Sequence, residues 1–382
     1  GALEKAQKVL DELHSRDVVS WSTLIAGFAH HGRGEEALLC YKLMQRDGIS
    51  PNVVTWICVL KACGGLKALD KGKHIHNEIE KKASIMGEDT VLGNALVDMY
   101  AKCDAIAEAR YSLNNLRGRD VVSWSSLIAG YIQQGQNEDA LMCFKEMQIE
   151  GLCPDAITFS YILKACGSIG AIAKGKEVHD EVANKGILRN DTTLGTALVD
   201  MYAKCGALGR ARKVLNELSE RNVAMWNALI SGYAQHGQGE EALECFRQML
   251  HDGMSPDAIT YVCLLNACTH SALVDEGQMC FAEMIKSYDI TPNPEHYACM
   301  VNLFSRVGHF EKATDVITKI PSSDYRPLWS ALLGSCQNWG NLNLGRLVFE
   351  HAMQLDGNHS ASYISLSNIY ATASMHDECR KA

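Results

Sequence analysis

The chain has 382 residues, 47% of them hydrophobic, a length that would allow two or three compact domains unless it contains internal repeats. Its formal net charge is −9 and its pI about 5.9, which excludes a broad basic surface that attracts nucleic acid by bulk charge. No run approaches 18 apolar residues, which argues against a membrane-spanning helix.

The first 52 residues predict one and a half helical hairpins. Residues 1–17 match residues 206–222 and correspond to the second half of a repeating unit. In residues 18–52, Trp21, Leu24, Ile25 and Phe28 have the spacing i, i+3, i+4, i+7 of an amphipathic helix. Glycines at 32 and 34 then separate this helix from a second one, which ends near Gly48.

The same unit recurs along the chain. GNALVDMYAKC at residues 93–103 returns as GTALVDMYAKC at 195–205, and WSTLIAG, WSSLIAG and WNALISG begin at Trp21, Trp124 and Trp226. Each copy keeps its apolar frame and varies one small polar residue. A lone hairpin cannot bury both faces, so we expect stacked hairpins with a continuous core, into which these tryptophans pack, and a concave groove.

The predicted units are 35, 36 or 37, and 31 residues long in rotation. They are 1–17 (partial), 18–52, 53–89, 90–120, 121–155, 156–191, 192–222, 223–257, 258–293 and 294–325. The 15 cysteines never form a C-x-x-C pair, and several recur at equivalent positions, as in LKAC, LKAC and LNAC at Cys63, Cys166 and Cys268. We interpret them as small buried hydrophobic residues.

These unit lengths, with VVSWSTLIAG, LKAC and LVDMYAKC at their places, closely resemble the PLS class of plant pentatricopeptide-repeat (PPR) proteins. The resemblance implies an all-α fold, a right-handed superhelical solenoid of stacked helix-turn-helix repeats. It makes 18–52, 121–155 and 223–257 P repeats, 53–89, 156–191 and 258–293 L repeats, and 90–120, 192–222 and 294–325 S repeats, with 1–17 a partial S repeat. Trp329, LLGSC at 332–336, GN at 340–341 and LSNIY at 366–370 resemble E extensions, a first over 326–359 and a truncated second over 360–382.

In that class the fifth and last residues of a repeat select one RNA base. The resemblance assigns this role to Ser22 with Asn52, Asn94 with Asp120, Ser125 with Asp155, Thr196 with Asn222, and Asn227 with Asp257. An ionised Asp only accepts hydrogen bonds and suits the imino donor of uracil or guanine, whereas Asn can donate to adenine or cytosine. A short Ser or Thr leaves room for a purine, and Asn suits a pyrimidine. The pairs then imply 5′-A-N-U-G-N-A-U-3′.

The long units do not follow this rule, and their bases stay open. Ile57 with Asp89 and Val262 with Asn293 lack a polar fifth residue, whereas Ser160 with Asp191 would formally read G. The last S unit has Ala298 at the selecting position and should discriminate little. By the alignment of editing factors, the edited cytidine would lie four nucleotides 3′ of the base at that unit.

The resemblance implies two further kinds of RNA contact. The second residues Val19, Val91, Val122 and Ala224 match the apolar pairs that sandwich each base, although ordinary packing at a helix start is the alternative. Lys102 and Lys204, in YAKC, match positions that contact phosphate, although a solvated lysine would look the same.

No enzyme site is expected in this chain. HNE at 76–78 and HDE at 179–181 and 376–378 fit the H-x-E half of a zinc deaminase, but the C-x-x-C half is missing. His76 and His179 are 103 residues apart, so the repeat accounts for both. There is no phosphate-binding loop or nucleophile elbow, and we predict no catalytic residue, metal or cofactor.

The sequence therefore predicts a reader of single-stranded RNA, the site-recognition part of an organellar C-to-U editing factor. The deaminase would lie in a further C-terminal domain or on a partner bound through the E extension; no membrane or small-molecule partner is expected. The resemblance implies a mitochondrial or chloroplast location. One alternative is a tetratricopeptide-like protein scaffold, which would keep a uniform 34-residue period. Another is RNA binding for transcript stabilisation or splicing without editing.

Overall fold

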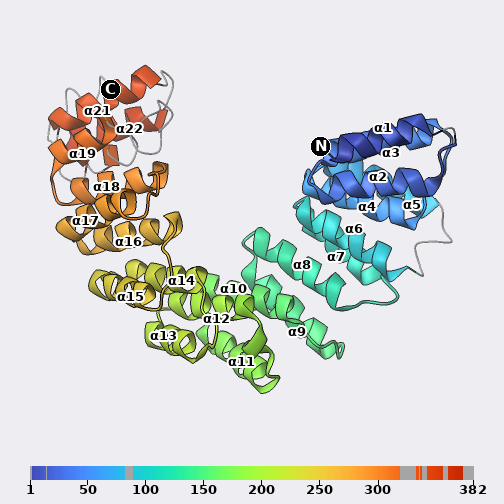
Figure 1. Ribbon diagram of the computed structural model, residues 1–382, viewed down its shortest axis with the longest axis horizontal. Helices are drawn as coiled ribbons and strands as arrows, with labels where there is room; N and C mark the ends of the chain where they lie inside the picture. The colour runs from blue at the N-terminus through green and yellow to red at the C-terminus, as the bar shows by residue number, and fades with distance from the viewer. Residues whose placement is uncertain are drawn as a thin grey trace. The chain divides into compact units, whose positions relative to one another are not determined.

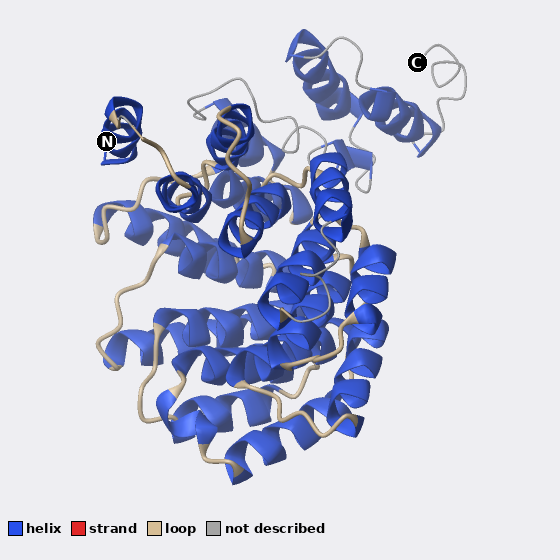
Figure 2. Cartoon of the chain, turned by 90° about the vertical axis from the view of Figure 1, so that its right-hand side faces the viewer, coloured by secondary structure: helices blue, strands red, loops and turns tan. Residues whose placement is uncertain are grey.

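The computed structural model describes residues 2–13, 15–81, 89–318, 333–334, 336–337, 342–355 and 360–372. Within these ranges every regular element is a helix and no strand occurs (Figure 2). The chain divides into two compact units, Gly1–Ile187 and Leu188–Ala382. No described helix is long and apolar enough to cross a membrane.

The first unit consists of one helix followed by five helical hairpins (Figure 1). Its helices are α1 (Ala2–Glu12), α2 (Val18–His30), α3 (Gly34–Arg46), α4 (Val53–Gly65), α5 (Leu69–Lys81), α6 (Thr90–Lys102), α7 (Ile106–Asn115), α8 (Val121–Gln133), α9 (Asn137–Ile149), α10 (Ala156–Ile169) and α11 (Ile172–Asn184). The first helices contact one another in order, α2 with α4, α4 with α6, α6 with α8 and α8 with α10. Each second helix packs against the first helix of its own hairpin, and α3, α5, α7 and α9 also pack against the first helix of the next one.

The second unit repeats this arrangement. Its helices are α12 (Thr192–Lys204), α13 (Leu208–Glu217), α14 (Val223–Gln235), α15 (Gly239–His251), α16 (Ala258–Ser271), α17 (Val274–Lys286), α18 (Pro294–Arg306), α19 (Phe310–Thr318), α21 (Leu342–Leu355) and α22 (Ser360–Thr372), and a short 3-10 helix, η1 (Ile187–Asn190), precedes them. Here α12, α14, α16 and α18 form the row of first helices. The prediction of an all-α stack of helical hairpins is confirmed.

A capping side chain starts almost every first helix. The residue before the helix is Asp or Asn in extended conformation, and its side-chain oxygen accepts a backbone N–H of the first turn, as Asp17 does from Ser20 and Asn52 from Thr55. Such caps satisfy donors that a helix start leaves unpaired, and each contributes about 1 kcal/mol. The last residue of one predicted unit is therefore the N-cap of the next first helix.

The recurrent tryptophans lie in the core between hairpins. Trp21, Trp124 and Trp226 are at most 2% exposed, which confirms their predicted packing role. Most described cysteines are buried as well, with Cys153 as the exposed exception. In α8, a Cβ added at Gly130 would lie 2.8 Å from Ala101 Cβ, so glycine lets α8 approach α6 closely.

The short units differ in their second helix. Helices α7 and α13 have 10 residues, whereas α3, α5, α9, α11, α15 and α17 have 13. Of the predicted E extensions, Trp329, Leu332, Gly340, Asn341 and residues 373–382 lie outside the described residues. The described parts that follow α19 include α21 and α22, which contact each other.

Candidate nucleic-acid interface

The fold brings the two members of each predicted base-selecting pair together. The fifth residue lies on a first helix, and the last residue caps the next first helix, which packs alongside it. The two members of a pair, 26 or 30 positions apart, therefore lie at one junction between hairpins. The five junctions are α2–α4, α6–α8, α8–α10, α12–α14 and α14–α16.

Three pairs are bonded directly through an asparagine amide. Asn94 Nδ2 donates to both carboxylate oxygens of Asp120, at 3.1 and 3.0 Å. Asn227 Nδ2 donates to Asp257 Oδ1 at 3.1 Å. The third contact, from the Nδ2 atom of Asn222 to Thr196 Oγ1, is long at 3.5 Å and therefore weak.

The Ser22–Asn52 pair is connected through a third side chain, Thr55. Ser22 Oγ lies 2.6 Å from Thr55 Oγ1, and Thr55 Oγ1 lies 2.8 Å from Asn52 Oδ1. Asn52 Oδ1 also accepts the backbone N–H of Thr55 at 2.9 Å, as an N-cap does. The carboxamide oxygen is thus turned into the helix, and its NH₂ group is the donor that remains on this exposed residue.

Thr158 connects the Ser125–Asp155 pair in the same way. Ser125 Oγ lies 2.5 Å from Thr158 Oγ1, which lies 2.7 Å from Asp155 Oδ1. Asp155 Oδ1 also accepts the backbone N–H of Thr158 at 2.8 Å. Ser125 is 8% exposed and Asp155 is exposed, so the carboxylate is the more accessible member of the pair.

The predicted stacking residues face solvent. Val19, Val91 and Val122 are 63, 61 and 55% exposed, and Ala224 is exposed as well. Their side chains are therefore accessible to a ligand. Three residues that we did not predict have the same exposure at the same position of the long units: Val54, Ile157 and Ile259. Their position in the sequence could have identified them, because each is the second residue of a predicted unit.

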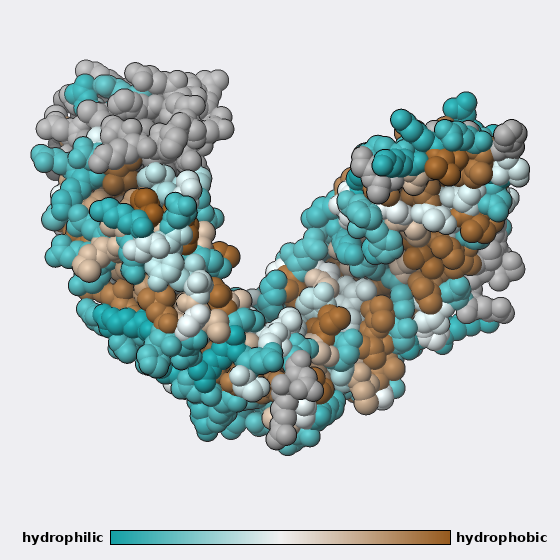
Figure 3. All heavy atoms as spheres, in the orientation of Figure 1, coloured by the Kyte–Doolittle hydropathy of each residue, from teal (hydrophilic) through white to brown (hydrophobic). Residues whose placement is uncertain are grey.

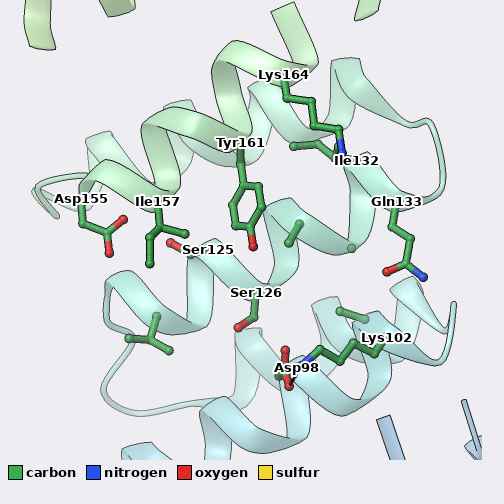
Figure 4. Close-up of a pocket in the computed structure, with 14 residues that line it drawn as sticks. Asp98, Lys102, Ser125, Ser126, Ile132, Gln133, Asp155, Ile157, Tyr161 and Lys164 are labelled. Atoms are coloured by element: carbon green, nitrogen blue, oxygen red, sulfur yellow. Dashed lines mark hydrogen bonds and ion pairs between the residues drawn. The ribbon is translucent and has the colours of Figure 1, made fainter. Parts of the chain in front are cut away.

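A pocket of about 490 Å³ unites these features in the first unit. Its size falls within the range of small-ligand sites. Figure 4 shows side chains from α6, α8 and α10 converging on it. The lining includes a predicted base-selecting pair, two exposed apolar second residues and two lysines: Ser125, Asp155, Val122, Ile157, Lys102 and Lys164.

The lysines of the YAKC motif each pair with an aspartate of their own helix. Lys102 Nζ lies 2.7 Å from Asp98 Oδ2 in the pocket lining, and Lys204 Nζ lies 2.8 Å from Asp200 Oδ2. These i,i+4 pairs are exposed and contribute little to stability. They do place an acidic group beside each predicted phosphate contact. Lys164, which we did not predict, has no ion pair within the described ranges and lines the same pocket.

The surface of the molecule is mixed in polarity (Figure 3). On the face drawn in Figure 3, hydrophilic surface predominates and exposed apolar side chains lie in patches within it. The acidic net charge adds no general attraction for polyanions. Affinity for such a ligand would depend on the recurring groups at the junctions.

His76, in the first H-x-E sequence, contacts a neighbouring helix. The His76 Nδ1 atom lies 2.7 Å from the Tyr100 hydroxyl, and burial lowers the pKa of His76. No group of three His, Cys, Asp or Glu within the described ranges could hold a metal ion. The sequence HDE at 376–378 lies outside those ranges.

Sequence comparison matches repeat profiles to about half of the chain. Residues 16–65, 119–168 and 221–270 match the PPR repeat family, and residues 196–223 and 259–288 match the PPR repeat. Two pentatricopeptide repeat-containing proteins of Arabidopsis thaliana, At4g38010 and At1g03540, are 38 and 36% identical over 99 and 98% of the chain. The chain spans 67 and 60% of their lengths. A third, CRR2, chloroplastic, is 35% identical over the full chain, which spans 58% of it.

Solved structures match the fold over 99% of the chain. The crystal structure of the pentatricopeptide repeat protein PPR10 from maize has a TM-score of 0.58 at 18% identity, and the chain covers 65% of it. PPR10 in complex with an 18-nt psaJ RNA element has a TM-score of 0.68 at 19% identity, with 61% covered. At this identity the likeness concerns the fold alone.

Proposed function

Because the chain belongs to the pentatricopeptide repeat family, we propose that it binds single-stranded RNA and reads one base per repeat. The observation that carries this proposal is the pocket at Ser125 and Asp155. A polar pair, an apolar residue from each flanking hairpin and two lysines meet there, which are the groups that a base edge, its two faces and a phosphate require.

A polar pair and at least one exposed apolar second residue recur at the other four junctions, and this recurrence supports reading along a strand. In chain order the pairs would read A at Ser22 and Asn52, U at Asn94 and Asp120, and G at Ser125 and Asp155. The pairs Thr196 with Asn222 and Asn227 with Asp257 would then read A and U. With the long units left open, the proposed site is 5′-A-N-U-G-N-A-U-3′, which runs in the direction of the chain.

We assign this RNA reader to the recognition of C-to-U editing sites. Support comes from the 35-, 36- and 31-residue rotation and from the E-like sequences after residue 325, which are typical of editing factors in the PLS class. The chemistry would then come from a deaminase domain elsewhere in the full protein or on a partner. The proposed compartment is a mitochondrion or chloroplast, because Arabidopsis relatives are named as mitochondrial or chloroplastic proteins.

Selection from a randomised single-stranded RNA pool tests RNA reading. Enrichment of A-N-U-G-N-A-U is expected, with preferences strongest at the five assigned positions. Retention of RNA without any base preference would contradict sequence reading. Failure to retain RNA at low salt would favour a protein-binding scaffold instead.

A separate experiment tests the editing role. Organellar RNA that co-purifies with the full-length protein should carry the enriched site, with a converted cytidine four nucleotides 3′ of the base at residues 294–325. In a plant that lacks the protein, this cytidine should stay unconverted. Normal editing combined with loss of the transcript would assign the protein to RNA stabilisation.

A further inference from the structure

Three buried threonines occupy one position of the fold, and no function described above uses them. Thr55, Thr158 and Thr260 are the third residues of α4, α10 and α16, and all are 0% exposed. Each follows a P unit, and each lies within hydrogen-bond distance of both members of that unit's predicted base-selecting pair.

The threonine determines which way the serine hydroxyl points. Asp155 carboxylate oxygens only accept hydrogen bonds, so Thr158 donates its single hydroxyl proton to Asp155 Oδ1. Ser125 Oγ, 2.5 Å from Thr158 Oγ1, must then donate to the threonine. Its proton is used inside the protein, and only its lone pairs remain for a ligand.

The same assignment of hydroxyl protons applies at Thr55. Asn52 Oδ1 is identified as the oxygen because it accepts the backbone N–H of the helix start, and it also accepts the Thr55 hydroxyl. Ser22, 2.6 Å from Thr55 Oγ1, is then the donor in that contact. Ser22 is also left as an acceptor.

At Asn227 the threonine orients an amide instead. The Thr260 hydroxyl lies 2.7 Å from Asn227 Oδ1 and 2.9 Å from Asp257 Oδ1, and the Asn227 NH₂ group is turned towards Asp257.

The short unit that ends at Asp120 has no such threonine contact. There Ser123 donates to the Asp120 backbone carbonyl, and the buried Asn94 Oδ1 has no hydrogen-bond partner.

We propose that Thr158 is a positioning residue for base choice: by holding the Ser125 hydroxyl as an acceptor, it makes the Ser125–Asp155 pair select guanine against uracil. Thr55 acts in the same way on Ser22. This inference rests on the proposed RNA reading and names a residue outside the fifth and last positions that sets its specificity.

The base edges explain the direction of the effect. Guanine presents two adjacent donors, N1–H and the N2 amino group, which match the Asp155 carboxylate and the Ser125 oxygen. Uracil presents one donor, N3–H, with a carbonyl oxygen on each side. An acceptor-only Ser125 would face a uracil carbonyl without a hydrogen between the two oxygens. A freely rotating Ser125 hydroxyl could donate a hydrogen bond to that carbonyl, so uracil would also bind.

The paired partners also explain why one serine serves two bases. Beside Asn52, the acceptor Ser22 faces the adenine N6 amino group while the Asn52 NH₂ donates to adenine N1. Beside Asp155, the acceptor Ser125 faces the guanine N2 amino group. In both cases the serine proton is hydrogen-bonded to the threonine and cannot contact the base. The last residue of the unit then selects between the two purines.

The test uses the whole chain and four RNAs that differ only at the fourth nucleotide of A-N-U-G-N-A-U. The variant Thr158→Val removes the hydroxyl at nearly constant volume. Its preference for G over U should fall roughly tenfold, the value of one satisfied hydrogen bond. The preference for G over A should stay, because Asp155 still repels the adenine N1 lone pair. Thr158→Ser restores the hydroxyl and should restore the G-over-U preference.

The matched control is Ser123→Ala. It removes a hydroxyl at the same position of α8 that hydrogen-bonds to the Asp120 backbone and not to Asn94, so the preference for U at the third nucleotide should be unchanged. An equal loss of affinity for all four bases in Thr158→Val, with the G:U ratio unchanged, would overturn the positioning role and leave RNA reading intact. Absence of any base preference in the unaltered chain would instead contradict the proposed function.

Discussion

The Asn94 side-chain amide donates to both carboxylate oxygens of Asp120, at 3.1 and 3.0 Å, although the two residues are 26 positions apart. Asp120 also caps α8 by accepting the Ser123 N–H at 2.9 Å. The side chain that we propose as a base selector is therefore a structural cap as well. Variants have to separate these two roles.

Exchange of one base-selecting pair should change the selected base. The double variant Asn94→Thr, Asp120→Asn rebuilds the Thr196–Asn222 pair, and the Asn at 120 keeps an N-cap oxygen. Preference at the third nucleotide of the site should move from U to A, with a difference of roughly 1–3 kcal/mol, by analogy with base-edge readout in DNA. Competition binding with RNAs that differ at that nucleotide measures it.

The reciprocal variant provides the control for this exchange. Thr196→Asn with Asn222→Asp should move the sixth nucleotide from A to U and leave the third unchanged. An unchanged preference in both variants, with thermal unfolding near that of the parent chain, would remove these residues from base selection.

The exposed apolar side chains should contribute affinity without base choice. Val122→Ala removes surface that we expect a base to cover, worth roughly 1–1.5 kcal/mol or a five- to tenfold increase in Kd. All four bases should be affected equally, because every base has an apolar face. Since Val122 is 55% exposed in the free chain, the melting temperature of the Val122→Ala variant should be close to that of the parent chain.

A matched leucine tests whether this effect is local. Leu39, on the second helix α3, is also exposed, so Leu39→Ala should leave the Kd for RNA unchanged. Equal loss of affinity in the two variants would show that Val122 acts through general stability.

The lysine–aspartate pairs should control the salt dependence of binding. Lys102→Ala should lower the slope of log K against log salt by about 0.7, the value for one phosphate contact on a single strand. Asp98→Asn should increase affinity at low salt and preserve base preferences, because it removes a negative charge 2.7 Å from Lys102. Titrations at several salt concentrations give both values.

A second lysine that pairs with an acidic residue of its own helix provides the control. Lys213, on the second helix α13, pairs with Glu217 at 3.7 Å, and Lys213→Ala should leave the slope unchanged. A slope that falls equally in the Lys102 and Lys213 variants would indicate diffuse attraction rather than a placed phosphate contact.

Stability should decrease as the pH falls below about 6.5, in part because of His296. Burial lowers the pKa of His296 below its ordinary value of 6.5, and its ring accepts the Asn293 N–H and donates to the Ala258 carbonyl. Between the two pKa values the unfolded chain binds the proton more readily, so acid favours unfolding. Full stability is present above 6.5.

Thermal unfolding at a series of pH values measures this effect. The melting temperature of His296→Gln should depend less on pH between pH 7.5 and 5.5. Part of the dependence should remain, because burial also lowers the pKa of His76. The same pH dependence in the variant and the parent chain would assign acid sensitivity to other groups.

Much of the local structure could be predicted from the sequence. The i, i+3, i+4, i+7 spacing after Trp21 predicted an amphipathic helix, and α2 buries that face. Register alone could also have identified the exposed residues that we missed, Val54, Ile157 and Ile259, because they occupy the same position as Val19 and Val122. The i,i+4 spacing of Asp98 and Lys102 is likewise visible in the sequence.

The sequence by itself determined the repeat and the buried face of each hairpin, because these depend on spacing within one unit. Only the tertiary structure decided that Thr158 lies between Ser125 and Asp155, and that Asn94 meets Asp120 directly. Hydrogen-bond direction depends on distances of a few tenths of an ångström between side chains on different helices. Helix packing sets those distances, and no periodicity along the chain encodes which oxygen keeps its proton.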